Sequence, residues 1–173
     1  DKVKIEYLFG LHNRPEIETG KVAVKKGSLM AAKDNFQIQI IGKGGHGGMP
    51  HLTIDPIVCS AGIIQAVQTI VSRNLDPLDS AVVSICSIHG GTPENLIVDR
   101  LDMTGSIRAL SEKGRELAKK RLEEIVTNTA SAYGCRAKVI YEGGVPLLYN
   151  TEDMYKLAYK AAVEAMGEEA VVS

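Results

Sequence analysis

The strongest constraint on the fold is the order of strand-like and helix-like segments between residues 34 and 142. Apolar residues that alternate with polar ones, as at Phe36, Ile38 and Ile40, are typical of a strand with one buried face. Apolar residues spaced three and four apart are typical of a helix that packs on a core. By these criteria the order is strand, helix, strand, strand, helix, strand. The segments are 35–41, 55–73, 81–88, 101–110 (after a short strand at 96–98), 111–133 and 136–141.

This order predicts an α+β domain of the ferredoxin-like type, β-α-β-β-α-β, in which two helices cover one face of a four-stranded antiparallel sheet. An open sheet of this kind has two edge strands whose backbone groups need partners. Pairing of one edge with a second copy of the chain would give a continuous sheet. We therefore predict a homodimer formed through this domain.

The residues on either side of this domain follow a different pattern. A strand pattern covers 2–11, two shorter strand patterns follow it without a helix, and 151–166 has the apolar spacing of a single helix. We therefore interpret 34–142 as one inserted domain and 1–33 and 143–173 as two parts of another. The chain is expected to be cut from a longer protein.

Composition excludes several classes of function. The 173 residues include 20 Lys and Arg against 21 Asp and Glu, with two Phe, no Trp and no basic run, so no nucleic-acid partner is expected. We expect no membrane association, because no apolar stretch reaches the roughly 18 residues that a spanning helix needs. Cys59, Cys86 and Cys135 have no metal-site spacing, which favours core thiols in a reducing cytoplasm.

A glycine-rich loop lies between the first strand and the first helix of the domain. Residues 42–51 hold five glycines, two histidines and a proline, and so much glycine lets a backbone approach a ligand or another chain closely. Lys43 is followed by Gly44 rather than by Ser or Thr, so this is not a nucleotide-binding P-loop. The loop either carries His46 as a functional imidazole or is a flexible connection with solvated His46 and His51.

Several of these segments, taken together and in order, resemble the M20 metallopeptidase family. The matching residues are Gly10-Leu11-His12-x-x-Pro15, Gly27-x-Leu29-Met30-Ala31-Ala32, Gly42-Lys43-Gly44-Gly45-His46-Gly47-x-Met49-Pro50-His51, Asp55-Pro56-Ile57, 71–83, Gly90-Gly91-Thr92-x-x-Asn95 and Gly105-x-Ile107-Arg108. The branch that the chain resembles contains aminoacylase-like amidohydrolases. These are hippurate hydrolases, N-acyl-amino-acid and indole-acetyl-amino-acid hydrolases, and N-acetyldiaminopimelate deacetylases.

The resemblance implies an enzyme more than twice as long as this chain. Members of the family have an α/β catalytic domain with a two-metal centre of zinc, manganese or cobalt, interrupted by a lid domain that dimerises. Residues 34–142 would be the lid, and 1–33 and 143–173 would be partial strands, a link and a helix of the catalytic domain. Most metal ligands and the acidic general base would lie outside this chain. We therefore expect the chain alone to be inactive and to bind no metal stably.

The resemblance also implies roles for four residues. His12 would be a metal ligand, although from spacing alone a single histidine is more often structural. His46 would reach the active site of the opposite subunit and stabilise the substrate carbonyl oxygen, with Asn95 as a second donor near that oxygen. Arg108 would receive the substrate carboxylate through its two-pronged guanidinium. From spacing alone, Asn95 is a turn residue and Arg108 forms a surface salt bridge.

The function that follows is the lid and dimerisation segment of a metal-dependent amidohydrolase that cleaves N-acyl amino acids or small peptides. The alternative is a non-catalytic ferredoxin-like module for dimerisation or small-ligand binding. The order of elements supports both hypotheses, because a fold does not specify a function.

Overall fold

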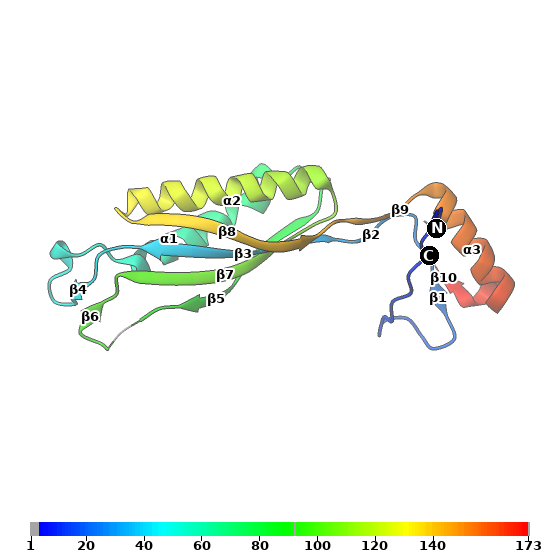
Figure 1. Ribbon diagram of the computed structural model, residues 1–173, viewed down its shortest axis with the longest axis horizontal. Coiled ribbons are helices and arrows are strands. Elements are labelled where there is room, and N and C mark those ends of the chain that lie inside the picture. The colour runs from blue at the N-terminus through cyan, green and yellow to red at the C-terminus, as the bar shows by residue number, and fades with distance from the viewer. Residues whose placement is uncertain (1–3, 92, 173) are drawn as a thin grey trace. The chain divides into compact units, whose positions relative to one another are not determined.

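The computed structural model describes residues 4–91 and 93–172. The chain forms two compact units, which are described separately here. One unit is Ser28–Tyr149, and the other combines Asp1–Gly27 with Asn150–Ser173 (Figure 1). The domain predicted from the sequence, 34–142, begins and ends a few residues inside the larger unit.

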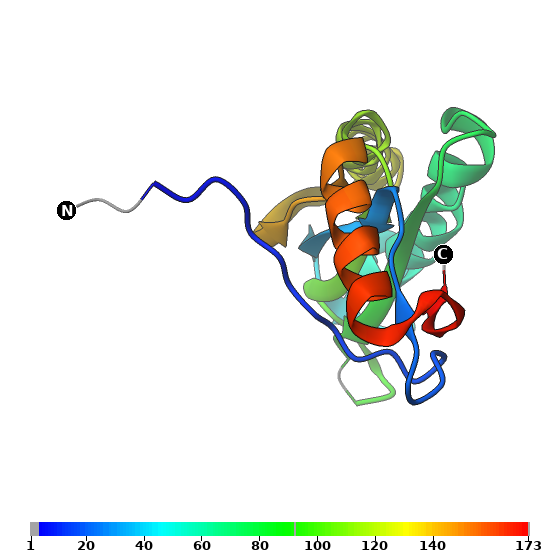
Figure 2. The same ribbon diagram turned by 90° about the vertical axis from the view of Figure 1, so that its right-hand side faces the viewer.

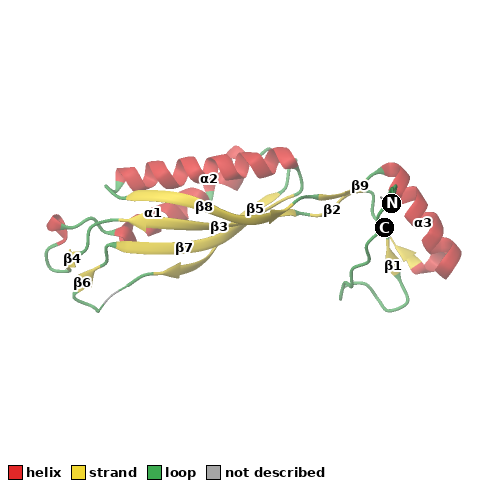
Figure 3. Cartoon of the chain, in the orientation of Figure 1, coloured by secondary structure: helices red, strands yellow, loops and turns green. Residues whose placement is uncertain are grey.

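The larger unit is built on a four-stranded sheet with the strand order β5-β7-β3-β8 (Figure 3). All three neighbouring pairs in this sheet are antiparallel. The strands are β3 (Ala32–Ile41), β5 (Ala81–His89), β7 (Arg100–Ala109) and β8 (Arg136–Val145). Strand β3 pairs with β7 from Ala32 opposite Ala109 to Ile41 opposite Arg100. This register fixes which residues share each end of the sheet.

Two helices pack against each other and against this sheet: α1 (Pro56–Val67) and α2 (Glu112–Ala132). Helix α1 begins where the Asp55 side chain accepts hydrogen bonds from the backbone N–H groups of Ile57 and Val58, at 2.8 and 3.3 Å. Helix α2 begins where Ser111 Oγ accepts from the N–H of Gly114 at 2.9 Å. Along the chain the elements run β3, α1, β5, β7, α2, β8, which is the order predicted from the sequence.

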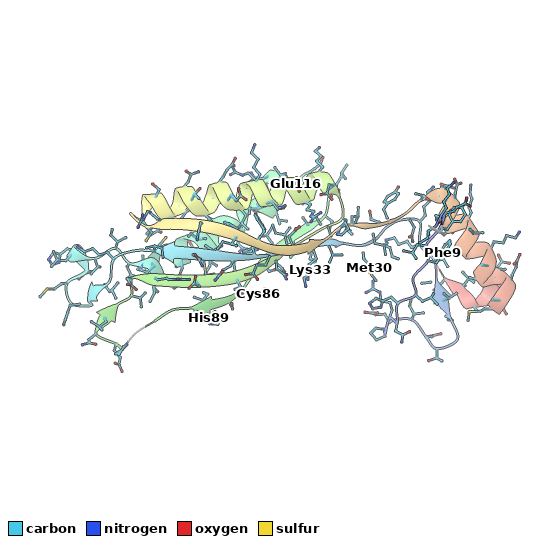
Figure 4. All side chains as sticks on the ribbon, viewed as in Figure 1. Phe9, Met30, Lys33, Cys86, His89 and Glu116 are labelled. Carbon is cyan, nitrogen blue, oxygen red and sulfur yellow. The ribbon has the colours of Figure 1, made fainter. Side chains whose placement is uncertain are left out.

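The core lies between the sheet and the helices. Alternate residues of β3 and β7 and the inward faces of α1 and α2 are buried. Among them are Phe36, Ile38, Ile40, Leu101, Met103, Ile107, Ile63, Val67, Leu122 and Val126. The intervening residues of the strands face the other side, where the sheet is polar: Lys33, Asn35 and Gln37 on β3, and Thr104, Ser106 and Arg108 on β7. We call this side of the sheet the open face. Figure 4 labels Lys33 on the sheet and Glu116 on helix α2.

The prediction of a strand at residues 2–11 is wrong for the residues that the structure describes. Lys2 and Val3 lie outside the described residues, and residues 4–11 run without regular structure (Figure 2). The apolar Leu8 and Leu11 are 89% and 97% exposed. A strand needs a ladder of backbone hydrogen bonds, and no other strand pairs with this segment within the described part of the chain. The apolar pattern alone therefore could not place it in a sheet.

The first predicted helix is also shorter than expected. Helix α1 ends at Val67 rather than at Arg73, and a π-helical turn, Ile70–Asn74, follows it. Thr69 Oγ1 donates to the carbonyl of Ala66 at 2.6 Å, and Ser72 Oγ donates to that of Gln68 at 3.1 Å. Such bonds compete for the carbonyl groups that a regular helix would use.

The smaller unit contains the predicted C-terminal helix and a short parallel strand pair. Helix α3 (Glu152–Met166) matches the expected range within one residue at its start. The strand expected at 21–26 is reduced to β1 (Val22–Ala23), which pairs with β10 (Val171–Val172). The chain passes between the units along β2 (Gly27–Met30) and β9 (Leu148–Asn150), which pair with each other. No helix in the described residues is both long and apolar enough to cross a membrane.

Candidate functional site

Backbone hydrogen bonds hold the glycine-rich loop against its own ends. The N–H of Lys43 donates to the carbonyl of Ile54 at 2.8 Å, and the N–H of Ile54 donates to the carbonyl of Lys43 at 2.9 Å. Gly42 is needed at this closure, because a Cβ atom there would lie 2.2 Å from the carbonyl oxygen of Ile54. The two ends of the loop are therefore joined by backbone hydrogen bonds.

The loop also forms a two-stranded ribbon with the segment between β5 and β7. Strand β4 (Gly45–His46) pairs antiparallel with β6 (Leu96–Ile97), so that His46 lies opposite Leu96. The N–H of Gly47 donates to the backbone carbonyl of Asn95 at 2.7 Å. The predicted site residues His46 and Asn95 are thus brought together at one end of the larger unit. Thr92, in the same segment, lies outside the described residues.

The His46 ring is exposed, and a hydrogen bond from the loop backbone orients it. Its Nδ1 atom accepts from the backbone N–H of Gly48 at 2.9 Å. A neutral imidazole that accepts at Nδ1 carries its proton at Nε2. The loop therefore presents His46 with a donor, Nε2–H, at its outer edge, which is the group that stabilisation of a developing oxyanion requires.

Arg108 lies at the other end of the sheet from this loop. The loop leaves β3 after Ile41, which pairs with Arg100, whereas Arg108 pairs with Lys33. Eight residues of extended strand separate Arg100 from Arg108, roughly 27 Å. One small substrate therefore cannot contact His46 and Arg108 of the same chain.

Arg108 lines a shallow cavity on the open face, with a volume of about 410 Å³. Its guanidinium Nη1 donates to the carbonyl of Ile107 at 3.3 Å, which leaves most of its hydrogen-bond donors available. The lining also contains the uncharged polar residues Asn35, Thr104 and Ser106 and the charged residues Lys33 and Glu142. This arrangement is suited to binding an anion that accepts several hydrogen bonds.

His12 lies in the smaller unit and belongs to no group of three metal donors among the residues that the structure describes. It is exposed, and its Nδ1 atom lies 2.6 Å from the carbonyl oxygen of Asn13. Among residues 4–91 and 93–172 no three His, Cys, Asp or Glu side chains are grouped so that they could hold a metal. A metal centre needs three or four donors. The donors described in this chain therefore do not by themselves fit a two-metal centre.

Sequence reasoning missed Lys33, which the structure places directly opposite Arg108 on the neighbouring strand. The polar alternation of Lys33, Asn35 and Gln37 could have placed Lys33 on the open face. Its pairing with Arg108 could not be found in this way, because the register of two strands that lie far apart in the sequence is set by the whole sheet.

The fold and the loop define a class of protein: an α+β domain that has one polar sheet face and presents a histidine in a glycine-rich loop. Residues 33–134 match a family described as the peptidase dimerisation domain of the M20 group. The chain belongs to this family, as the sequence motifs predicted.

The chain is also similar in sequence to two curated proteins, and in sequence and fold to a solved structure. The chain is 39% identical over 161 residues to N-acetyl-L-cysteine deacetylase of Bacillus subtilis, covering 93% of this chain and 39% of that protein. It is 37% identical to an IAA-amino acid hydrolase of Arabidopsis thaliana, covering 97% of this chain and 39% of that protein. The crystal structure of the Bacillus subtilis YXEP protein, described as a dinuclear metal binding peptidase from the M20 family, is 30% identical, with a TM-score of 0.69. This match covers 89% of this chain and 37% of the YXEP chain.

The chain thus spans about two fifths of the length of the curated relatives that it matches. By their names, one of these relatives is a deacetylase and the other is a hydrolase.

Proposed function

We propose that this chain is the lid and dimerisation segment of a longer metal-dependent amidohydrolase that cleaves N-acyl amino acids, hippurate-type substrates included. The observation that carries the proposal is the exposed His46 ring, held with Nε2–H outward and with Asn95 beside its loop. The names of the relatives, a deacetylase of N-acetyl-L-cysteine and a hydrolase of IAA-amino acids, support the substrate class. The strand order β5-β7-β3-β8 supports assignment of the larger unit to the ferredoxin-like class.

The two edges of the sheet differ in a way that favours one of them for dimerisation. Strand β5 and helix α1 contain no Asp, Glu, Lys or Arg, whereas β8 and α2 are rich in charge. Ile57 and Val58 on α1 are 46% and 54% exposed, and Val82 and Ile88 on β5 are 53% and 50% exposed. Uncharged edges with exposed apolar residues are the ones that pair with another chain. We place the homodimer contact along β5 and α1.

This contact would make the site composite. In a two-fold dimer the two β5 strands run antiparallel, so the His89 end of one strand lies beside the Ala81 end of the other. Ala81 pairs with Ala109, next to Arg108, and His89 pairs with Asp102, near the end that carries the loop. The partner subunit's His46 is therefore brought toward Arg108. The distance between these residues within one chain would be explained by their acting across the dimer.

The roles of the residues follow from their chemistry. Arg108 binds the carboxylate of the substrate through paired N–H donors. The partner subunit's His46 donates Nε2–H to the amide oxygen as negative charge develops on it, and Asn95 adds an amide donor near that oxygen. The proposed parent enzyme holds two divalent metal ions, of zinc, manganese or cobalt, with His12 as one ligand and the other donors outside this chain. A cytoplasmic location remains a prediction.

Complementation between two inactive variants tests the proposal. His46→Ala and Arg108→Ala are each introduced into the full-length parent, and the two variants are produced separately and then co-expressed. The His46→Ala homodimer is expected to lose hydrolysis of N-acyl amino acids by 100-fold or more, roughly the cost of one oxyanion donor. The Arg108→Ala homodimer is expected to lose it because the substrate carboxylate no longer has its paired N–H donors. Co-expression should restore about a quarter of the wild-type activity, because half of the randomly paired dimers then have one intact composite site.

Failure of the co-expressed pair to recover activity would contradict the composite site. Full turnover by the His46→Ala homodimer would contradict the catalytic role of the loop and favour a non-catalytic dimerisation module. Size-exclusion chromatography of each variant serves as the control that the dimer persists.

A further inference from the structure

Two cations face each other on the open face of the sheet. Lys33 on β3 and Arg108 on β7 are directly opposite in the antiparallel register, and both side chains are partly buried. Side chains in such a pair have Cβ atoms about 5 Å apart, and like charges placed there destabilise the sheet. An arrangement that costs stability needs a compensating partner.

No carboxylate in the described part of the chain forms an ion pair with either cation. The ion pairs within residues 4–91 and 93–172 include neither Lys33 nor Arg108, and the hydrogen bond of Arg108 is to a neighbouring backbone carbonyl. Glu142 lines the same cavity but pairs in register with Asn35 and forms no ion pair with either cation. The two positive charges remain available to an anion from outside the chain.

The surroundings of the pair are those of a small-anion site. Lys33 and Arg108 line the cavity of about 410 Å³ together with Asn35, Thr104 and Ser106, which add neutral hydrogen-bond donors. Arg108 can bind one carboxylate with two parallel N–H···O bonds, whereas the ammonium of Lys33 acts as a point charge on a flexible stem. The site therefore offers two different receptors for two carboxylates at a short distance from each other.

We propose that Lys33 selects acidic substrates, in which an N-acyl amino acid carries a second carboxylate on its side chain. Arg108 binds the α-carboxylate, and Lys33 binds the side-chain carboxylate of an aspartyl or glutamyl residue. This inference rests on the proposed function for its catalytic consequence. The binding of a dicarboxylate at Lys33 and Arg108 does not depend on that function and can be measured separately.

The first experiment measures binding by the 173-residue chain itself. Glutarate and butyrate, a dicarboxylate and a monocarboxylate of similar length, are titrated by isothermal calorimetry and by NMR of the backbone amides of β3 and β7. Glutarate is expected to bind about tenfold more tightly than butyrate, as one further charge-assisted contact predicts. Lys33→Met, which keeps the apolar stem and removes the charge, should abolish this difference.

Matched variants define the site. Lys138→Met removes another lysine from the open face, on β8 opposite Gln39, and should leave the preference for glutarate unchanged. Glu142→Gln should strengthen glutarate binding, because it removes the acidic group that lines the cavity. Equal affinities for glutarate and butyrate, or a preference that survives in Lys33→Met, would overturn the inference.

The second experiment measures selectivity in the full-length parent. N-acetylglutamate and N-acetylglutamine have nearly the same shape and differ in one charge, so the ratio of their kcat/KM values isolates the role of Lys33. Lys33→Met should lower this ratio about tenfold, and Lys33→Arg should keep it near the wild-type value. A ratio unchanged in Lys33→Met would overturn the inference, whereas no hydrolysis of any N-acyl amino acid by the wild type would overturn the proposed function alone.

Discussion

The Asp34 carboxylate accepts two hydrogen bonds from the Arg115 guanidinium, from Nε to Oδ2 at 2.6 Å and from Nη2 to Oδ1 at 2.8 Å. The two side chains are 5% and 15% exposed. Asp34 lies near the start of β3 and Arg115 in the first turns of α2, so this pair joins the central strand to the helix that covers it. The fork-to-fork geometry satisfies both carboxylate oxygens and offsets the cost of burying the charges.

Removal of Arg115 should therefore be strongly destabilising. Arg115→Met leaves the Asp34 carboxylate buried without its partner, and the free energy of unfolding is expected to fall by about 3–5 kcal/mol. The matched control is Arg100→Met, which breaks an equally two-pronged contact with Asp102 on the solvent-exposed side of the sheet. Urea denaturation followed by circular dichroism compares the two variants. Similar losses in both would show that burial does not decide the strength of these pairs.

The same pair predicts how stability depends on pH. The hydrogen bonds from Arg115 hold the pKa of Asp34 below its usual value of 3.8. Because the unfolded state then binds the proton more readily than the folded state, the contribution of Asp34 is fully present well above pH 3.8. It is lost as the pH falls through 3.8 toward the pKa of the folded state.

A comparison with Asp34→Asn measures this contribution. The difference in unfolding free energy between wild type and Asp34→Asn should be constant from about pH 5 to 7 and should shrink below pH 4. Urea titrations at half-unit pH intervals check this expectation. A difference that stays constant down to pH 3 would mean that the pKa of Asp34 is not lowered in the folded state.

The sequence predicts the central domain better than its flanks, for a physical reason. Phe36, Ile38 and Ile40 alternate because β3 has one buried and one open face, and both conditions are met within the larger unit. Residues 4–11 have a similar apolar pattern but no neighbouring strand among the described residues. A strand depends on partners elsewhere in the chain, so a local pattern identifies it only when those partners are present.

The candidate site shows the same limit. Motif resemblance indicates His46, Asn95 and Arg108, but the sequence does not reveal that the first two meet through the β4–β6 ribbon. It also does not reveal that Arg108 lies at the other end of the sheet, opposite Lys33. Both relationships depend on strand register, which is set by the packing of the whole sheet rather than by residues near each site.

The closure of the glycine-rich loop gives a prediction at Gly42. In Gly42→Ala the new Cβ atom would lie 2.2 Å from the carbonyl oxygen of Ile54, so the bridge between Lys43 and Ile54 must open. Stability should fall by roughly 1–3 kcal/mol, and the amide hydrogens of Lys43 and Ile54 should exchange faster with solvent. Gly10→Ala is the control, because no atom lies within 4 Å of a Cβ placed there. Unchanged exchange in Gly42→Ala would show that the loop is not held by this bridge.

The three free cysteines should differ in reactivity. Cys59 and Cys135 are buried and Cys86 is exposed. Burial raises the pKa of the Cys59 thiol to about 12, and burial also raises that of Cys135. The reactive thiolate is therefore scarce at both core positions near pH 8. A colorimetric disulfide reagent should label only Cys86 in the native chain and all three cysteines in denaturant. Rapid labelling of the native Cys86→Ser variant would contradict this expectation.

The proposed dimer contact predicts that one edge of the sheet tolerates charge and the other does not. Ile88 on β5 and Val145 on β8 are 50% and 58% exposed, so a lysine at either position costs little in the isolated chain. In a two-fold interface along β5, however, Ile88→Lys introduces two like charges into one apolar contact, because each subunit contributes the same surface. Sedimentation equilibrium at micromolar concentration should show a monomer for Ile88→Lys and a dimer for wild type and Val145→Lys. A dimer that persists in Ile88→Lys but dissociates in Val145→Lys would assign the contact to β8. A contact along β8 would place the partner subunit's loop away from Arg108, and the composite site would then have no geometric basis.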